Sequence, residues 1–170
     1  ALAGEEENRT MGLLLANPVS RSKVVSEKLL AMVVYGIIVG VVVFAGTSAG
    51  NWVAGLGMDY GNIAATAALA TLIGLLFGAL SLLVSAGTGR TRWAIFIPIG
   101  AALALHTLNA LASLSDAAWG KLSPFYYYLG SDPLNNGMDW GHAAVLAGAT
   151  ALLIGLSYPA FQRRDLHQSG

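Results

Sequence analysis

The stretch IAATAALATLIGLLFGALSLLV, residues 63–84, decides how this sequence folds. It contains no Asp, Glu, Lys or Arg, and about 20 such residues in a helix cross a hydrocarbon core of about 30 Å. Because that core holds no water, the backbone must satisfy its own hydrogen bonds, and a single apolar run of this length does so only as a helix. We therefore predict a transmembrane helix over residues 63–84.

Three further apolar runs are equally free of charged side chains. They are LLAMVVYGIIVGVVVFAGT at 29–47, WAIFIPIGAALALHTLNALASL at 93–114 and AAVLAGATALLIGLSYPAF at 143–161. Of the 170 residues, 55% are hydrophobic and 11% charged, against about 25% charged residues in an ordinary soluble domain. The predicted fold class is all-α: a polytopic bundle of four transmembrane helices that forms one domain over residues 1–170.

Lys and Arg residues are distributed unevenly between the loops. With the amino-terminal segment inside, eight of the nine fall on the cytoplasmic side and only Lys121 falls outside. Since cytoplasmic loops favour Lys and Arg, we expect a multi-pass plasma-membrane protein with 1–28 and 162–170 inside, 48–62 and 115–142 outside, and a tight inner turn at 87–92. The aromatic residues expected near the outer interface, where amphipathic rings are favoured, are Trp52, Tyr60, Trp119 and Trp140.

Residues 1–28 form a charged and partly amphipathic segment ahead of the first run. Glu5, Glu6 and Glu7 suit the first turn of a helix, where acids complement the helix dipole, and Pro18 ends that helix. A second helix is expected to begin at about Arg21 and to run into the first span. The segment is either a docking surface on the membrane or a solvated lead-in with ordinary cationic anchors, and its charges fit both readings.

Several function classes lack the residues they need. The chain has no Cys and a formal net charge of zero, so neither thiolate chemistry nor nucleic-acid binding is expected. The Gly-rich turn at 87–92 lacks the GxxxxGK[ST] phosphate loop. The acids at 5–7 resemble the paired-Glu motif of intramembrane prenyl-protein proteases, but Thr10 and Met11 stand where that motif needs Arg. With its three His residues expected at different levels, the chain is predicted to hold no catalytic residue, metal or cofactor.

His106 and Asn109 are the strongly polar side chains expected deep inside a span. Their i, i+3 spacing places them on one helix face, and polar groups in lipid usually face the interior of a bundle. They either line a pathway or form hydrogen bonds that hold helices together. Pro98 in the same helix removes a backbone donor and is expected to bend it.

Glycine pairs and the last external loop complete the pattern. Gly36 with Gly40, and Gly74 with Gly78, have the spacing that lets helices approach closely, either within the bundle or at a dimer face. In the loop at 115–142, Pro124 is expected to start a helical turn. The following PFYYYL stretch, which includes Tyr126, Tyr127 and Tyr128, then lies at the interface or dips back into the membrane as a re-entrant element.

Three segments together resemble the permease subunits of type-2 ABC transporters, including the group that exports antibiotics and polyketides. They are GEEENRTMGLLLANPVSRSKVVSEK at 4–28, LSPFYYYLGSDPLNNGMDWGH at 122–142 and AFQRRDL at 160–166. The resemblance implies a six-span permease whose third to sixth spans are the four runs found here, so that this sequence is expected to be a fragment without the first two. It also implies that the opening segment is a cytoplasmic coupling helix.

The function implied by this resemblance is that of a permease subunit in an ATP-driven exporter of a hydrophobic or amphipathic substrate. ATP and Mg are expected on a separate ATP-binding subunit, and a second permease, identical or different, completes the pore. The expected ATPase-coupling residues are Glu5, Glu6, Glu7, Leu14, Pro18 and Arg21, and the pathway candidates are His106, Asn109, Tyr126, Tyr127 and Tyr128. A non-transporting membrane scaffold or immunity protein, and an intramembrane hydrolase, are the alternatives that stay open.

Overall fold

The computed structural model describes residues 21–115 and 118–162, where the chain forms helices joined by short turns and loops. Four helices are long and apolar enough to cross a membrane. They are α3 (Arg21–Ala54), α4 (Tyr60–Thr88), α5 (Thr91–Leu114) and α8 (Trp140–Gln162). Between α5 and α8 lie the 3-10 helix η1 (Ala118–Leu122) and the short helices α6 (Pro124–Leu129) and α7 (Pro133–Asn136). The predicted all-helical bundle of four spans is confirmed.

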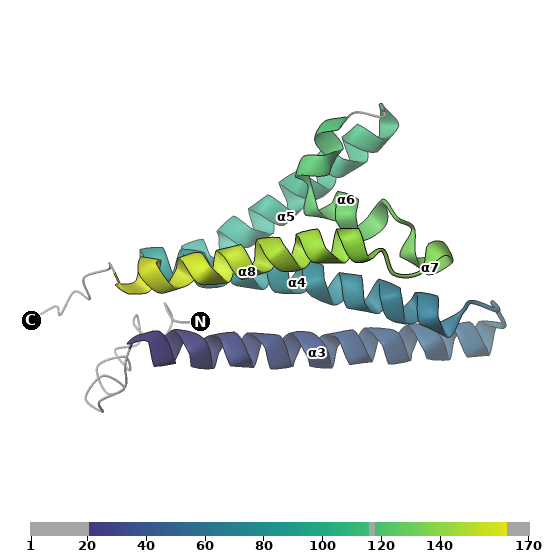
Figure 1. The fold of residues 1–170 in the computed structure, drawn as a ribbon, viewed down its shortest axis with the longest axis horizontal. Helices are drawn as coiled ribbons and strands as arrows, with labels where there is room; N and C mark the ends of the chain where they lie inside the picture. Colours follow the sequence, from purple (N-terminus) through teal and green to yellow (C-terminus); the bar gives the residue numbers. More distant parts are fainter. Residues whose placement is uncertain (1–20, 116–117, 163–170) are drawn as a thin grey trace, which may run out of the picture.

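The centre of the bundle is α4, the helix that contains the opening stretch. It packs against α8 most extensively and also against α3 and α5 (Figure 1). In the most apolar 18-residue stretch of α4, 33% of the residues are buried inside the protein, whereas in the corresponding stretch of α3 the share is 0%. Small and aliphatic side chains such as Ala65, Leu69 and Ala79 provide the buried face of α4. The other helices therefore expose most of their apolar surface, as expected for helices that lipid surrounds.

Glycines bring α3 close to α4. A Cβ atom at Gly36 would lie 2.7 Å from Leu75 Cδ2, and one at Gly78 would lie 2.8 Å from Met32 Sδ. A Cβ atom at Gly40 would overlap the Thr71 side chain. In lipid, close packing of this kind replaces the hydrophobic drive for association. Of the two interpretations of the glycine spacing, packing within the bundle therefore holds for these three positions.

A proline and a serine join α4 to α5. Pro98 lies inside α5 and is buried, and its missing N–H leaves the carbonyl of Ala94, one turn earlier, without its helical donor. The Ser81 hydroxyl of α4 donates a hydrogen bond to that carbonyl at 2.7 Å. Neighbouring Ser side chains are a usual way in which membrane helices tolerate proline, and α5 continues through Pro98 to Leu114.

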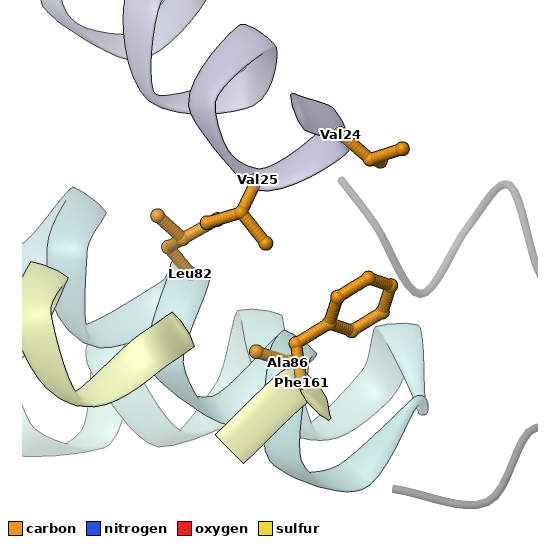
Figure 2. Packing of buried hydrophobic residues seen from close by; sticks show 5 residues of the cluster. All are labelled: Val24, Val25, Leu82, Ala86 and Phe161. Atoms are coloured by element: carbon orange, nitrogen blue, oxygen red, sulfur yellow. The ribbon is translucent and has the colours of Figure 1, made fainter. Parts of the chain in front are cut away.

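At one end of the bundle, here called the basic end because it carries Lys23, Lys28, Arg90 and Arg92, a small apolar cluster ties three helices together. It consists of Val24 and Val25 from α3, Leu82 and Ala86 from α4, and Phe161 from α8. Figure 2 shows Val25 facing Leu82, with the Phe161 ring beside Ala86. The first turns of α3 and the last turns of α8 are thus held on α4.

The loops are shorter than predicted. The expected span at 29–47 is part of a helix that runs from Arg21 to Ala54, which confirms a helix start at about Arg21. The expected loop at 48–62 is wrong, because only residues 55–59 lie between α3 and α4. Asn51 explains the late end of α3: its side chain is buried and makes two hydrogen bonds of 3.0 Å to the backbone of Met58, so it closes the turn from inside the helix.

The opposite end, here called the aromatic end, carries the large aromatic side chains that were predicted to form a belt. Trp52, Tyr60, Trp119 and Trp140 are all exposed there. At the basic end, the tight turn predicted at 87–92 is confirmed: Gly89 ends α4 at a φ of 63°, a conformation that favours glycine, and α5 begins at Thr91. Helix α3 begins at the basic end, and α8 ends there (Figure 1).

Candidate functional site

The chain between α5 and α8 folds back along the bundle at the aromatic end. Residues 118–136, here called the return segment, comprise η1, α6 and α7, and α6 lies between α5 and α8 (Figure 1). The buried Ser123 hydroxyl donates to the carbonyl of Leu105 at 2.8 Å. Leu105 precedes the end of α5 by nine residues, so the chain returns by about 14 Å along the helix axis.

Local sequence explains how this return is made. Ser123 caps α6 by accepting a hydrogen bond from the N–H of Phe125 at 3.2 Å, and Pro124 occupies the first helical position, where its missing N–H costs nothing. Gly120 allows the chain to lie against α5, since a Cβ atom there would come within 2.8 Å of the Ala112 methyl. The helical turn predicted to start at Pro124 is confirmed.

The Phe125 ring of α6 fills the space between α4 and α5. It lies 5.9 Å from the Phe77 ring and 5.0 Å from the His106 ring, which it meets edge to face. His106 is therefore a contact of the return segment, although the residue is exposed. Asn109, one turn further along α5, is partly exposed.

The three tyrosines of α6 face α4 and α8. Tyr127 and Tyr128 pack against an apolar cluster formed by Leu69 of α4 with Ala143 and Leu146 of α8. Because these contacts come from two different long helices, α6 joins the aromatic ends of α4 and α8 in the way that Phe161 joins their basic ends.

His142 forms an aromatic cluster that the sequence patterns did not indicate. Its ring lies 5.5 Å from the Tyr126 ring and 5.3 Å from the Tyr127 ring, and its Nε2 lies 4.0 Å from Asp139 Oδ2. Asp139 accepts a hydrogen bond from the His142 backbone N–H at 3.0 Å. That bond, helped by the nearby imidazole, lowers the pKa of Asp139 from its ordinary value of 3.8 despite some desolvation. Asp139 therefore caps the start of α8. An Asp directly before a predicted helix is the sequence signal for such a cap.

Beneath α6, between α4, α5 and α8, lies a cleft of about 420 Å³. All the residues that line it are apolar except Lys121 and Tyr127. The residues that line it are Leu76, Phe77, Leu80, Leu105, Lys121, Leu122, Pro124, Tyr127, Val145, Leu146, Ala149 and Leu153. Of the five pathway candidates, Tyr127 reaches this cleft.

The comparison with known protein families fits this architecture. The family model described as ABC-2 family transporter protein matches residues 1–166. The chain belongs to this family. No curated protein and no solved structure matches the chain. The chain is therefore the membrane subunit of an ABC-2 transporter, a multi-pass membrane protein.

Membership of the family also bears on chemistry. An ABC-2 membrane permease domain carries no catalytic activity itself and is typically free of cofactors. Permeases of this family generally pair with ATP-binding subunits. Within residues 21–115 and 118–162 of this ABC-2 permease, no group of three His, Asp or Glu side chains is arranged to hold a metal ion.

The residues expected to couple the ABC-2 permease to an ATPase lie at its amino-terminal end. Glu5, Glu6, Glu7, Leu14 and Pro18 fall outside the residues that the structure describes. Arg21 is the first residue of α3. One turn later in the chain come Val24 and Val25, which belong to the apolar cluster at the basic end.

Proposed function

We propose that this ABC-2 permease is half of the membrane pore of an ATP-driven exporter. A second permease, identical or different, forms the other half, and a separate ATP-binding subunit docks on residues 1–28. The substrate is hydrophobic or amphipathic and crosses the plasma membrane. Family membership supports this proposal, and so does the uneven distribution of Lys and Arg, which places the basic end in the cytoplasm.

The observation that carries the proposal is the apolar cluster at the basic end. Val25 is 1% exposed and Phe161 is 2% exposed, and the Ser26 hydroxyl lies 2.8 Å from the Tyr158 hydroxyl. A docked ATPase that displaces residues 1–20 therefore moves the base of α3, and tight packing passes that movement to α4 and α8, because packed interiors transmit displacement.

The return segment supplies the other half of the mechanism. It lies between α5 and α8 at the aromatic end, and Tyr127 and Tyr128 are among its contacts to α4 and α8. In the proposed exporter this end faces outward, and the segment closes the pathway until α4 and α8 move. Movement at the basic end then opens the aromatic end through rigid helices.

Charge reversal in the coupling segment tests the proposal. In the full-length permease, we expect Glu5→Lys, Glu6→Lys and Glu7→Lys together to abolish co-purification of the ATP-binding subunit and transport-coupled ATP turnover. The matched control changes the same three residues together to Asp, because that triple variant keeps all three negative charges. We expect that variant to keep both activities.

A second variant separates docking from transmission. Phe161→Ala removes the ring that joins α8 to α3 and α4. We expect this variant to retain the ATPase subunit but to lose most of the stimulation of ATP turnover by substrate. If the triple charge reversal leaves association and coupled turnover unchanged, the assignment of Glu5, Glu6 and Glu7 to ATPase coupling is wrong. A wild-type permease that binds no ATP-binding subunit would overturn the exporter proposal and favour a non-transporting membrane scaffold.

A further inference from the structure

The cleft beneath α6 has the size of a ligand site. It holds about 420 Å³, and pockets for small molecules usually hold about 300–1,000 Å³. Leu76 and Leu80 of α4 form one wall, and Val145, Ala149 and Leu153 of α8 form another. These side chains offer no hydrogen bonds, so the body of a ligand that enters the cleft must be apolar.

One charged group lies on this apolar wall. Lys121, in η1, lines the cleft beside Leu122 and Pro124, and it is an exposed residue. A lysine can lay its apolar stem along such a surface while its ammonium group reaches toward water. The ammonium group therefore marks one edge of the cleft, where the head of a ligand remains partly hydrated.

A second groove provides a comparison within the same molecule. It lies between α3, α4 and the start of α8 and holds about 590 Å³, but every side chain that lines it is uncharged; it includes Phe44, Ala68 and Trp140. This groove is suited to the acyl chains of any lipid. A positive charge on the wall distinguishes the cleft beneath α6 from an ordinary lipid-facing groove.

We propose that the cleft beneath α6 binds an amphiphile with one long acyl chain and an anionic head. The acyl chain lies along Leu76 and Ala149, and the carboxylate or phosphate head pairs with Lys121, with the Tyr127 hydroxyl as a further donor. Such a molecule is either the transported substrate or a resident lipid, and only the first assignment rests on the proposed export function. Both share the chemistry that the cleft selects.

Binding is measured without nucleotide. The full-length permease in nanodiscs of zwitterionic lipid is titrated with dansyl-labelled undecanoic acid and with its neutral methyl ester. We expect the acid to bind five- to tenfold more tightly than the ester, about 1–1.4 kcal/mol. Equal affinities for acid and ester overturn the proposal.

Three variants assign the binding to this cleft. Lys121→Gln is expected to remove the preference for the acid, and Lys121→Arg to keep it. Ala149→Leu narrows the cleft and is expected to weaken the binding of both the acid and the ester. The matched Ala68→Leu change lies in the uncharged groove and is expected to leave the binding of both probes, and the preference for the acid, intact. An acid preference that survives Lys121→Gln overturns the proposal.

A parallel measurement separates the two sources of the ligand. If the acid raises ATP turnover of the permease with its ATP-binding subunit, and Lys121→Gln removes that rise, the ligand is the transported substrate. If turnover is unchanged but an anionic lipid co-purifies with the wild type and not with Lys121→Gln, the ligand is a resident lipid. If the proposed export function is wrong, only the rise in ATP turnover is lost, because the titrations that measure ligand binding need no ATP.

Discussion

The hydrogen bond from Ser81 to the carbonyl of Ala94 gives a prediction that a double-mutant cycle can test. Pro98 deprives that carbonyl of its helical donor, and the Ser81 hydroxyl supplies another at 2.7 Å. Ser81→Ala leaves the carbonyl with no donor within a membrane helix. Pro98→Ala restores the N–H one turn later, so in that background the serine is no longer needed.

The expected magnitudes follow from the environment. Leaving a buried carbonyl without a partner costs about 1–3 kcal/mol, and hydrogen bonds between membrane helices contribute about 0.6 kcal/mol on average and up to about 1.7 kcal/mol. Because Ser81 is half-buried, we expect Ser81→Ala to lower the free energy of unfolding by about 1.5 kcal/mol. In the Pro98→Ala background we expect a loss of about 0.3 kcal/mol, which gives a coupling of about 1.2 kcal/mol.

The assay is equilibrium unfolding in mixed micelles as the fraction of denaturing detergent is raised. Ser113→Ala is the control, because the Ser113 hydroxyl donates only to Ala110 of its own helix at 2.8 Å. We expect that change to cost less than about 0.5 kcal/mol. Equal losses for Ser81→Ala in the two backgrounds would refute the reasoning, since they would show that the serine does not replace the missing N–H of Pro98.

Three further predictions rest on single contacts. Gly40→Leu is expected to lower the free energy of unfolding by about 1–3 kcal/mol because its side chain overlaps α4, whereas Gly46→Leu, which meets no neighbour, leaves unfolding in the same micelles nearly unchanged. Ser123→Ala loses a cap and a hydrogen bond to α5. Backbone amides at 125–129 are therefore expected to exchange about tenfold faster for each 1.4 kcal/mol lost, as measured by mass spectrometry, and unchanged exchange would contradict the docking role of this hydroxyl. The pKa of Asp139 is lowered in the folded protein, so its contribution to stability is complete above about pH 4 and declines as pH falls through the lowered value. Asp139→Asn is therefore expected to reduce the dependence of the melting temperature on pH between about pH 2 and 4. An identical dependence in the variant would exclude this contribution.

Sequence alone was sufficient for the long helices because their signal is local. Each apolar run must satisfy its own backbone bonds in lipid. All four were recovered, with ends within four residues of the predicted ones except in α3, which spans residues 21–54 where the run was predicted at 29–47. The largest error was at 48–62, which was expected to lie outside because the first apolar run was taken to end at residue 47. There, Asn51 bonds the backbone of Met58 from within the last turn of α3, a contact that composition does not reveal.

The candidate site was recovered only in part, because its contacts join distant parts of the chain. Pro124 marked the start of α6, but the depth of the return segment depends on the bond from Ser123 to Leu105, and neither residue stands out in the sequence. From the sequence, His142 was expected at the outer membrane–water interface, at a different level from the other two His residues. In the structure its ring lies against the rings of Tyr126 and Tyr127. Likewise, Lys121 counted as a lone outer charge, and only the fold places it on an apolar wall.

The central position of α4 has a consequence for how the protein is made. Its most extensive packing partner, α8, is also the last helix in the chain. A ribosome that has finished α4 at Thr88 must still synthesise the chain as far as Gln162 before that partner is complete, which takes about 4–15 s at about 5–20 residues per second. During that interval the face of α4 that will pack against α8 lacks this partner. Lipid, or a protein of the insertion machinery, must cover that face until α8 is complete.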